Sequence, residues 1–189
     1  LDVPGFLDGR RVWVWLPPDG GEVSAANAGH VVPTSVVISG REALVIDPGP
    51  SQAHGERLRR SLACRFGARV RTIVNTHAHS ENVLANSAFA DEVAAGRTEI
   101  VASGPTREGM AQRCPDCLAS LTQRLGEAAM AGTRTLPAAA SSRCFCGSPV
   151  KKRRPAHSSQ SMMPMAKMSA RASIVLRLRS AASACTIGD

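Results

Sequence analysis

The sequence predicts an α/β domain in which strands and helices alternate after an initial β-hairpin. Short apolar runs with period-two alternation indicate strands, and stretches with apolar residues every three or four positions indicate amphipathic helices. Gly- and Pro-rich segments separate these elements. Because the two kinds of element alternate along residues 1–136, the expected architecture is a layered domain in which helices cover a sheet.

The first three strands are expected at residues 11–16, 34–38 and 42–46. In the first, apolar residues alternate with two tryptophans, and a Pro-Pro-Asp-Gly-Gly run ends it. Residues 39–41, Ser-Gly-Arg, join the second and third strands in the manner of a β-hairpin. A Pro-Gly-Pro run directly after Asp47 ends the third strand.

A helix is expected next along the chain. Ser51 can cap its start, Leu58, Leu62 and Phe66 repeat every four residues, and Gly67 can end it. The spacing predicts that one face of this helix packs on the sheet.

The remaining elements are expected on either side of a pair of histidines. Residues 70–74 are an apolar run typical of a buried strand, and a helical pattern begins near Val83. Another strand is expected at residues 99–103. The helical pattern over residues 106–130 is expected to break near Pro115.

The two histidines, His77 and His79, follow the end of the strand at residues 70–74. In an extended segment, residues i and i+2 project to the same side, so both imidazoles can reach one ion. Such a pair also occurs by chance, but ligands of open α/β sheets bind at this end of the strands. Glu81 adds a carboxylate nearby. The sequence therefore predicts half of a tetrahedral metal site, with further ligands from elsewhere in the fold.

Two segments together resemble a known family. Residues 45–49 (Val-Ile-Asp-Pro-Gly), then a helix, a strand and residues 75–82 (Asn-Thr-His-Ala-His-Ser-Glu-Asn), resemble the metallo-β-lactamase superfamily. The pattern looks closest to the zinc metallohydrolases associated with quinoprotein relay systems. The resemblance extends over residues 28–136 and implies the N-terminal half of an αββα sandwich, followed by a poorly structured basic tail.

The resemblance also implies roles for individual residues. His77 and His79 would bind zinc, and Asp47 would orient the metal loop without touching the ion. The family pattern is His-x-His-x-Asp-His, whereas Glu81 and Asn82 occupy its last two positions here. Glu81 could bind metal or handle the attacking water. Asn82 replaces an imidazole poorly, so one zinc is expected rather than two, and Asn82, like Asp47, is expected to support the site without touching the ion.

The family also uses a histidine from the second half of its sandwich. The only later histidine in this sequence is His157, which is the candidate for a further zinc ligand. The resemblance implies a periplasmic or secreted protein, and a cytoplasmic location stays open. The sequence lacks an apolar run of about 18 residues, so no membrane span is expected. It begins with Leu, and its start shows no signal-peptide pattern.

Charge divides the chain. Residues 1–127 contain 13 Arg, no Lys and 14 acidic residues, a formal net charge of −1. Residues 128–189 contain 7 Arg, 3 Lys and one acidic residue, a formal net charge of +9. Residues 137–189, rich in Ala, Ser and Met, are therefore expected to be a basic tail. Translation out of frame is a hypothesis that would explain the change in charge. Its basic cluster at 151–154 has no set of aromatic side chains for base stacking, so nucleic acid is not an expected partner.

Other candidate residues are expected to have packing roles. Cys114 and Cys117 are separated by two residues but lack a second pair at zinc-finger spacing, which favours a local disulfide or two reduced cysteines. His30 and His54 are expected to pack within the fold. The oligomeric state stays open.

The main functional hypothesis is a zinc-dependent hydrolase in which metal-activated water attacks an ester, thioester or amide of a small-molecule substrate. The alternative is a truncated, catalytically inactive domain remnant with a basic tail. An eight-fold barrel of the amidohydrolase kind is excluded because such barrels need about 250 residues.

Overall fold

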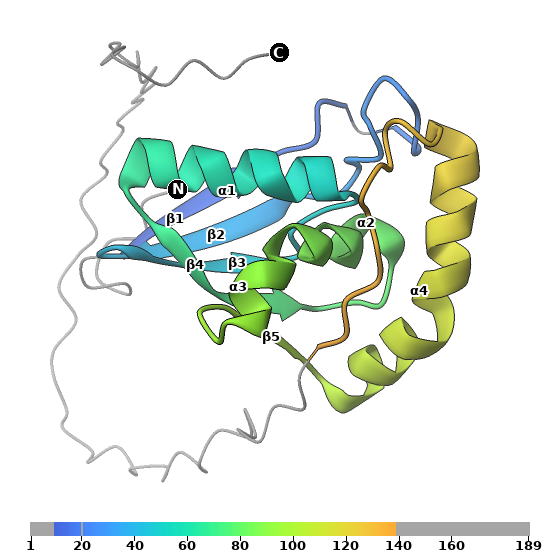
Figure 1. The fold of residues 1–189 in the computed structure, drawn as a ribbon. Coiled ribbons are helices and arrows are strands. Elements are labelled where there is room, and N and C mark those ends of the chain that lie inside the picture. Colours follow the sequence, from blue (N-terminus) through green and yellow to red (C-terminus); the bar gives the residue numbers. More distant parts are fainter. Residues whose placement is uncertain (1–9, 20, 139–189) are drawn as a thin grey trace, which may run out of the picture. The chain divides into compact units, whose positions relative to one another are not determined.

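A five-stranded mixed sheet forms the centre of the computed structural model, which describes residues 10–19 and 21–138. The strand order is β1-β2-β3-β4-β5 (Figure 1). The first two pairings are antiparallel and the last two are parallel. The strands are β1 (Arg10–Trp15), β2 (Thr34–Ser39), β3 (Glu42–Ile46), β4 (Arg69–Asn75) and β5 (Glu99–Ala102). The predicted α/β class and the predicted hairpin are confirmed.

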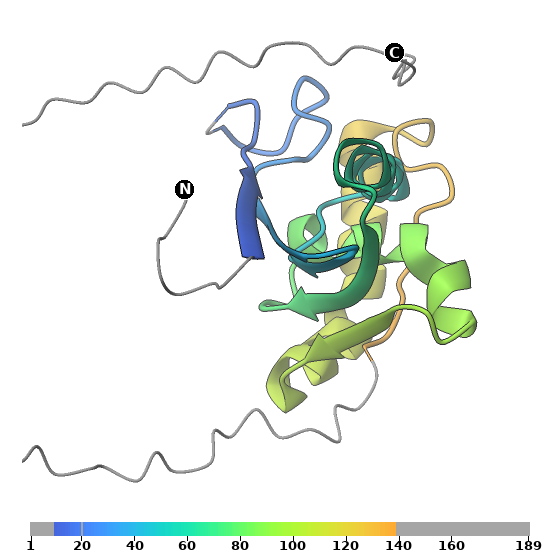
Figure 2. The ribbon, with the colours of Figure 1, turned by 90° about the vertical axis from the view of Figure 1, so that its left-hand side faces the viewer.

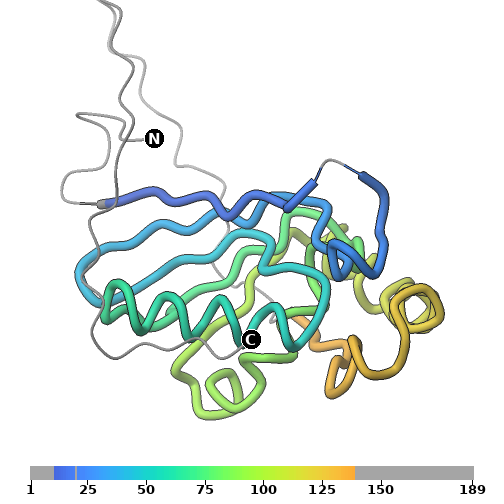
Figure 3. The backbone as a smooth tube through the Cα atoms, turned by 90° about the horizontal axis from the view of Figure 1, so that it is seen from above, coloured from blue at the N-terminus to red at the C-terminus, as the bar shows by residue number. Residues whose placement is uncertain are grey.

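Helices occupy one face of this sheet. The helical elements are α1 (Gln52–Phe66), α2 (Ser80–Val83), the 3₁₀ helix η1 (Leu84–Phe89), α3 (Ala90–Ala94) and α4 (Gly104–Leu125). The views from the side and from above show α1 running alongside the strands on the same side as α3 (Figures 2 and 3). The core between this face and the helices is almost fully buried: Val45, Ile73 and Ile100 of the strands and Phe89 of η1 are at most 1% exposed.

α1 forms as its sequence predicts. Ser51 accepts a hydrogen bond from the backbone N–H of His54, which satisfies one of the free donors at the helix start. Leu58 and Leu62 are buried on the sheet side. At the other end Gly67 adopts a left-handed conformation with φ +60° and ends the helix.

The helix expected to start near Val83 begins earlier and is not continuous. It starts at Ser80 and divides into α2, η1 and α3. The reason is competition for backbone groups: Gly49 donates to the carbonyl of Asn82 and accepts from the N–H of Ala85. These bonds to a neighbouring loop hold the segment against the Asp-Pro-Gly turn.

The helix α4 also differs from expectation. It begins at Gly104, after the capping residue Ser103, and ends at Leu125. Pro115 lies inside the helix without breaking it. An internal proline costs about 3 kcal/mol, and burial of apolar side chains on both sides of it outweighs that cost. The buried residues are Gly109, Met110, Cys114 and Leu121.

The tail lies largely outside the described residues. By its contacts the chain divides after Arg143, and the described residues all belong to the first unit. The predictions for His157, the basic cluster at 151–154 and a possible frame change therefore stay predictions. Among residues 10–19 and 21–138, none of the helices has the length and apolar character needed to span a membrane.

Candidate metal site

The predicted metal ligands lie in the loop between β4 and α2. β4 ends at Asn75, and α2 begins at Ser80. The loop emerges at the carboxyl end of β4, beside the carboxyl end of β3. Both imidazoles are exposed, and the side chain of His79 is 57% accessible to solvent. The sheet thus presents both histidines at the strand end where α/β proteins bind ligands.

The two imidazole rings are close neighbours in this loop. The ring centroids of His77 and His79 are 6.0 Å apart, and the ring planes differ by 32°. With Zn–N bonds of about 2.0–2.1 Å, two imidazoles that share one zinc have centroids at most about 6.4 Å apart. The observed spacing is below this upper limit and, for a shared zinc, corresponds to a wider angle than that of the tetrahedral site predicted from the sequence.

A hydroxyl links His77 to a buried carboxylate. The carboxylate of Asp47 accepts hydrogen bonds from both the backbone N–H and the hydroxyl of Thr76, the former at 2.9 Å. The same hydroxyl lies 2.8 Å from Nδ1 of His77. Because the hydroxyl proton points to the carboxylate, its oxygen can accept from Nδ1–H of the imidazole. In the neutral imidazole, the tautomer that makes this bond carries its proton on Nδ1 and has an unprotonated Nε2, the form that binds metal.

Asp47 holds an unusual backbone conformation to provide this link. Its φ is +52°, in the left-handed region, and its side chain is buried. Its N–H donates to the carbonyl of Val74 at 3.0 Å, and its carbonyl accepts from the hydroxyl of Thr34 at 2.8 Å. These bonds offset a conformational cost of about 1–2 kcal/mol. The structure thus places Asp47 behind the metal loop.

Glu81 lies beside the second histidine. Its Oε1 is 3.7 Å from Nδ1 of His79, and its Oε2 accepts from the hydroxyl of Ser80 at 3.1 Å. The carboxylate therefore lies beside the imidazole of His79, but Glu81, His77 and His79 are not grouped closely enough in this structure to hold one metal.

Asn82 is placed differently from these residues. Its side chain is buried, its N–H donates to the carbonyl of His79, and its carbonyl accepts from Gly49. Asn82 thus joins the histidine loop to the Asp-Pro-Gly turn through its backbone. Within the described ranges, no three His, Cys, Asp or Glu side chains are grouped closely enough to hold a metal.

The sequence analysis did not identify Thr76, which bridges Asp47 and His77 in the structure. The available signal in the sequence was a hydroxyl residue directly before the first histidine. A second polar link under the loop was also missed. The buried side chains of Asn75 and Asn86 face each other, and Nδ2 of Asn86 donates to Oδ1 of Asn75 at 2.8 Å. This pair ties the end of β4 to η1.

A separate aromatic cluster surrounds His30 and His54, as expected of packing residues. The ring of Trp15 stacks on His54 at 4.1 Å, and the centroid of His30 is 4.4 Å from that of His54. Burial, and then the charges of His30 and Arg57, lower the pKa of His54 to about 3. Burial also lowers the pKa of His30, partly opposed by a backbone hydrogen bond with Val32.

The two cysteines of α4 are not bonded. Cys114 is buried and Cys117 is partly exposed, and both are free thiols. Burial and the proximity of Cys117 raise the pKa of Cys114, and Arg113 partly opposes this shift. Of the alternatives left open by the sequence, two reduced packing cysteines agrees with this arrangement.

No family model and no curated protein matches this chain. Three solved structures similar to parts of it, each with 18% sequence identity, are metallo-β-lactamases. The one from Erythrobacter litoralis has a TM-score of 0.38, and the match covers 45% of this chain and 34% of that chain. The one from Hirschia baltica has a TM-score of 0.38, with 56% of this chain and 43% of that chain covered. The one from Pseudomonas aeruginosa, FIM-1 in its mono-zinc form, has a TM-score of 0.43, with 60% of this chain and 48% of that chain covered. This chain spans less than half the length of each of these three proteins.

Proposed function

We propose that this protein is a zinc-dependent hydrolase of the metallo-β-lactamase type, acting on an ester, thioester or amide of a small molecule. One observation carries the proposal. The link from Asp47 through Thr76 to Nδ1 of His77 leaves Nε2 free, while the ring of His79 lies 6.0 Å away at the same strand end. This is the arrangement of a metal-binding imidazole held by an oriented partner.

Each residue has a defined task in this proposal. His77 and His79 hold the ion. A bound zinc lowers the pKa of its water to near 7 and so supplies a nucleophile at neutral pH. Glu81 lies where it can accept a proton or orient the attacking water. Asp47 and Thr76 keep the imidazole of His77 in the tautomer that binds metal.

A working zinc site needs a third protein ligand. His157 is our candidate, and it lies outside the described residues. The family resemblance also leads us to propose a periplasmic or secreted location.

A second candidate is a half-site that binds metal weakly and turns over no substrate. The observation in its favour is that the described residues group two histidines without a third His, Cys, Asp or Glu ligand. Turnover by the zinc-loaded protein separates the two candidates.

The test is hydrolysis by the full chain loaded with zinc, using a β-lactam, a thioester and a p-nitrophenyl ester as substrates. Glu81→Gln is expected to lower kcat roughly 10²–10⁴-fold, the contribution of a positioned acid–base group. Glu108→Gln, an exposed residue on α4, is the matched control and should leave kcat unchanged. Hydrolysis that is unaffected by His77→Ala or His79→Ala would rule out the proposed site.

A further inference from the structure

A cavity of about 430 Å³ lies away from the histidine loop. Its lining comes from the second half of α1, the start of β4 and the segment from η1 to β5. Glu42 and Arg69 begin β3 and β4, so this cavity lies at the amino ends of the parallel strands. The histidines follow the carboxyl end of β4. The lining residues are Glu42, Arg59, Ala63, Ala68, Arg69, Val70, Arg71, Phe89, Glu92, Gly96, Arg97 and Thr98.

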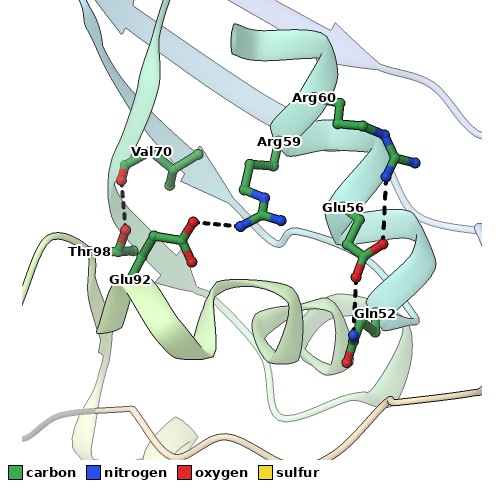
Figure 4. A network of polar contacts seen from close by, with 7 residues as sticks. All are labelled: Gln52, Glu56, Arg59, Arg60, Val70, Glu92 and Thr98. Atoms are coloured by element: carbon green, nitrogen blue, oxygen red, sulfur yellow. Dashed lines mark hydrogen bonds and ion pairs between the residues drawn. The ribbon is translucent and has the colours of Figure 1, made fainter. Parts of the chain in front are cut away.

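The wall formed by the segment between α3 and β5 is fixed by hydrogen bonds. Nη1 of Arg71 donates to the carbonyls of Gly96 and Arg97, at 3.2 and 3.0 Å. The hydroxyl of Thr98 donates to the carbonyl of Val70 at 2.8 Å (Figure 4). These bonds tie the segment to β4, so the cavity is formed before any ligand binds, which lowers the entropic cost of binding.

The charges on the lining are unequally paired. Arg59 of α1 and Glu92 of α3 form an ion pair across the cavity wall and offset each other (Figure 4). Arg69 and Arg97 are exposed, and no hydrogen bond or ion pair joins their guanidinium groups to another residue of the described ranges. Apart from the Arg59–Glu92 pair, the lining has three positive charges, on Arg69, Arg71 and Arg97, and one negative charge, on Glu42. The rim therefore attracts anions.

The lining also includes four apolar residues, Ala63, Ala68, Val70 and Phe89. Ala63 is exposed, and the other three are almost fully buried. We propose that this cavity binds a small organic anion, with its phosphate or carboxylate head between Arg69 and Arg97 and its apolar body against the apolar part of the lining at Ala63. Guanidinium groups recognise both kinds of head through paired N–H donors. The volume lies within the range of sites for small ligands, about 300–1,000 Å³.

The test is titration calorimetry of the full-length protein with phenylphosphonate, which carries a dianionic head on an apolar ring. Saturable binding is expected. Arg69→Gln and Arg97→Gln should each weaken it roughly tenfold, as loss of a hydrogen bond to a charged group does. Arg113→Gln on α4, outside the lining, is the control and should bind with unchanged affinity. Circular dichroism confirms that each variant is folded.

Two further binding experiments test which part of the probe is recognised and whether it binds in this cavity. Inorganic phosphate and benzyl alcohol, which each carry half of the probe, should bind more weakly than phenylphosphonate. A His77→Ala/His79→Ala variant should bind it as the wild type does, because the cavity is separate from the proposed metal site. Absence of saturable binding, equal affinity for inorganic phosphate, unchanged affinity in both arginine variants, or dependence on the histidines would each overturn the proposal.

Discussion

The hydroxyl of Thr76 joins the buried carboxylate of Asp47 to the imidazole of His77. We predict that Thr76→Val lowers zinc affinity about 10–100-fold, the usual effect of losing a group that orients a metal ligand. Competition with a chromophoric zinc chelator measures this change. Thr72→Val on β4 is the control, since its hydroxyl contacts Glu99 instead. Equal affinity of the two variants would show that the hydroxyl does not orient the imidazole.

His54 provides a prediction about pH. Its pKa is about 3 in the folded protein against 6.5 ordinarily. The unfolded chain therefore takes up a proton below pH 6.5 that the native state takes up only near pH 3. Its contribution to stability is fully present above pH 6.5 and falls by up to about 1.4 kcal/mol per pH unit as the pH decreases toward 3.

The variant His54→Phe keeps an aromatic ring against Trp15 but cannot be protonated. We expect its free energy of unfolding to depend less on pH between 6.5 and 3 than that of the wild type, as measured by urea denaturation. The exposed His79→Phe serves as control. If the free energy of unfolding of the His54 variant depended on pH as steeply as that of the wild type, the buried neutral imidazole would not be the cause of the pH dependence.

At the scale of the elements, packing of α1 against η1 depends on a glycine. A Cβ added to Gly55 would lie 2.6 Å from the carbonyl oxygen of Ala85 and 2.7 Å from Cβ of Ala88. Gly→Ala normally stabilises a helix interior by about 1 kcal/mol. Here we predict the opposite sign, a loss of about 1–3 kcal/mol from the forced separation of two packed elements.

The matched control is Ala63→Gly at an exposed position of the same helix. It should cost about 0.5–1 kcal/mol through helix propensity alone. Thermal and chemical denaturation of both variants measure the difference. A stabilised Gly55→Ala protein would mean that α1 and η1 are not in close contact.

The sequence predicted the local elements better than their continuity. Ser51 and Gly67 act within one helix turn, so their capping roles can be inferred from the sequence. The division of residues 80–94 into three short helices depends on bonds from Gly49, which is distant in the sequence. In the same way, burial on both sides of Pro115 keeps α4 continuous, and only the packed structure shows it.

At the scale of the whole molecule, the place of the histidine pair in the fold could be predicted, and the full set of ligands could not. The histidine pair follows an apolar strand, and a strand end is where a sheet presents ligands. Thr76 was missed because its role depends on Asp47, which reaches the loop through parallel pairing of β3 with β4. The third ligand stays a prediction because His157 lies outside the described residues.

The measurement that tests the central claim most directly is zinc stoichiometry of the purified full-length protein by metal analysis. Wild-type protein dialysed against zinc should retain close to one equivalent. The His77→Ala/His79→Ala variant should retain much less, while the control His30→Phe/His54→Phe variant should match the wild type. Equal zinc in the wild type and the His77→Ala/His79→Ala variant, or none in either, would contradict the claim that these two imidazoles hold one ion.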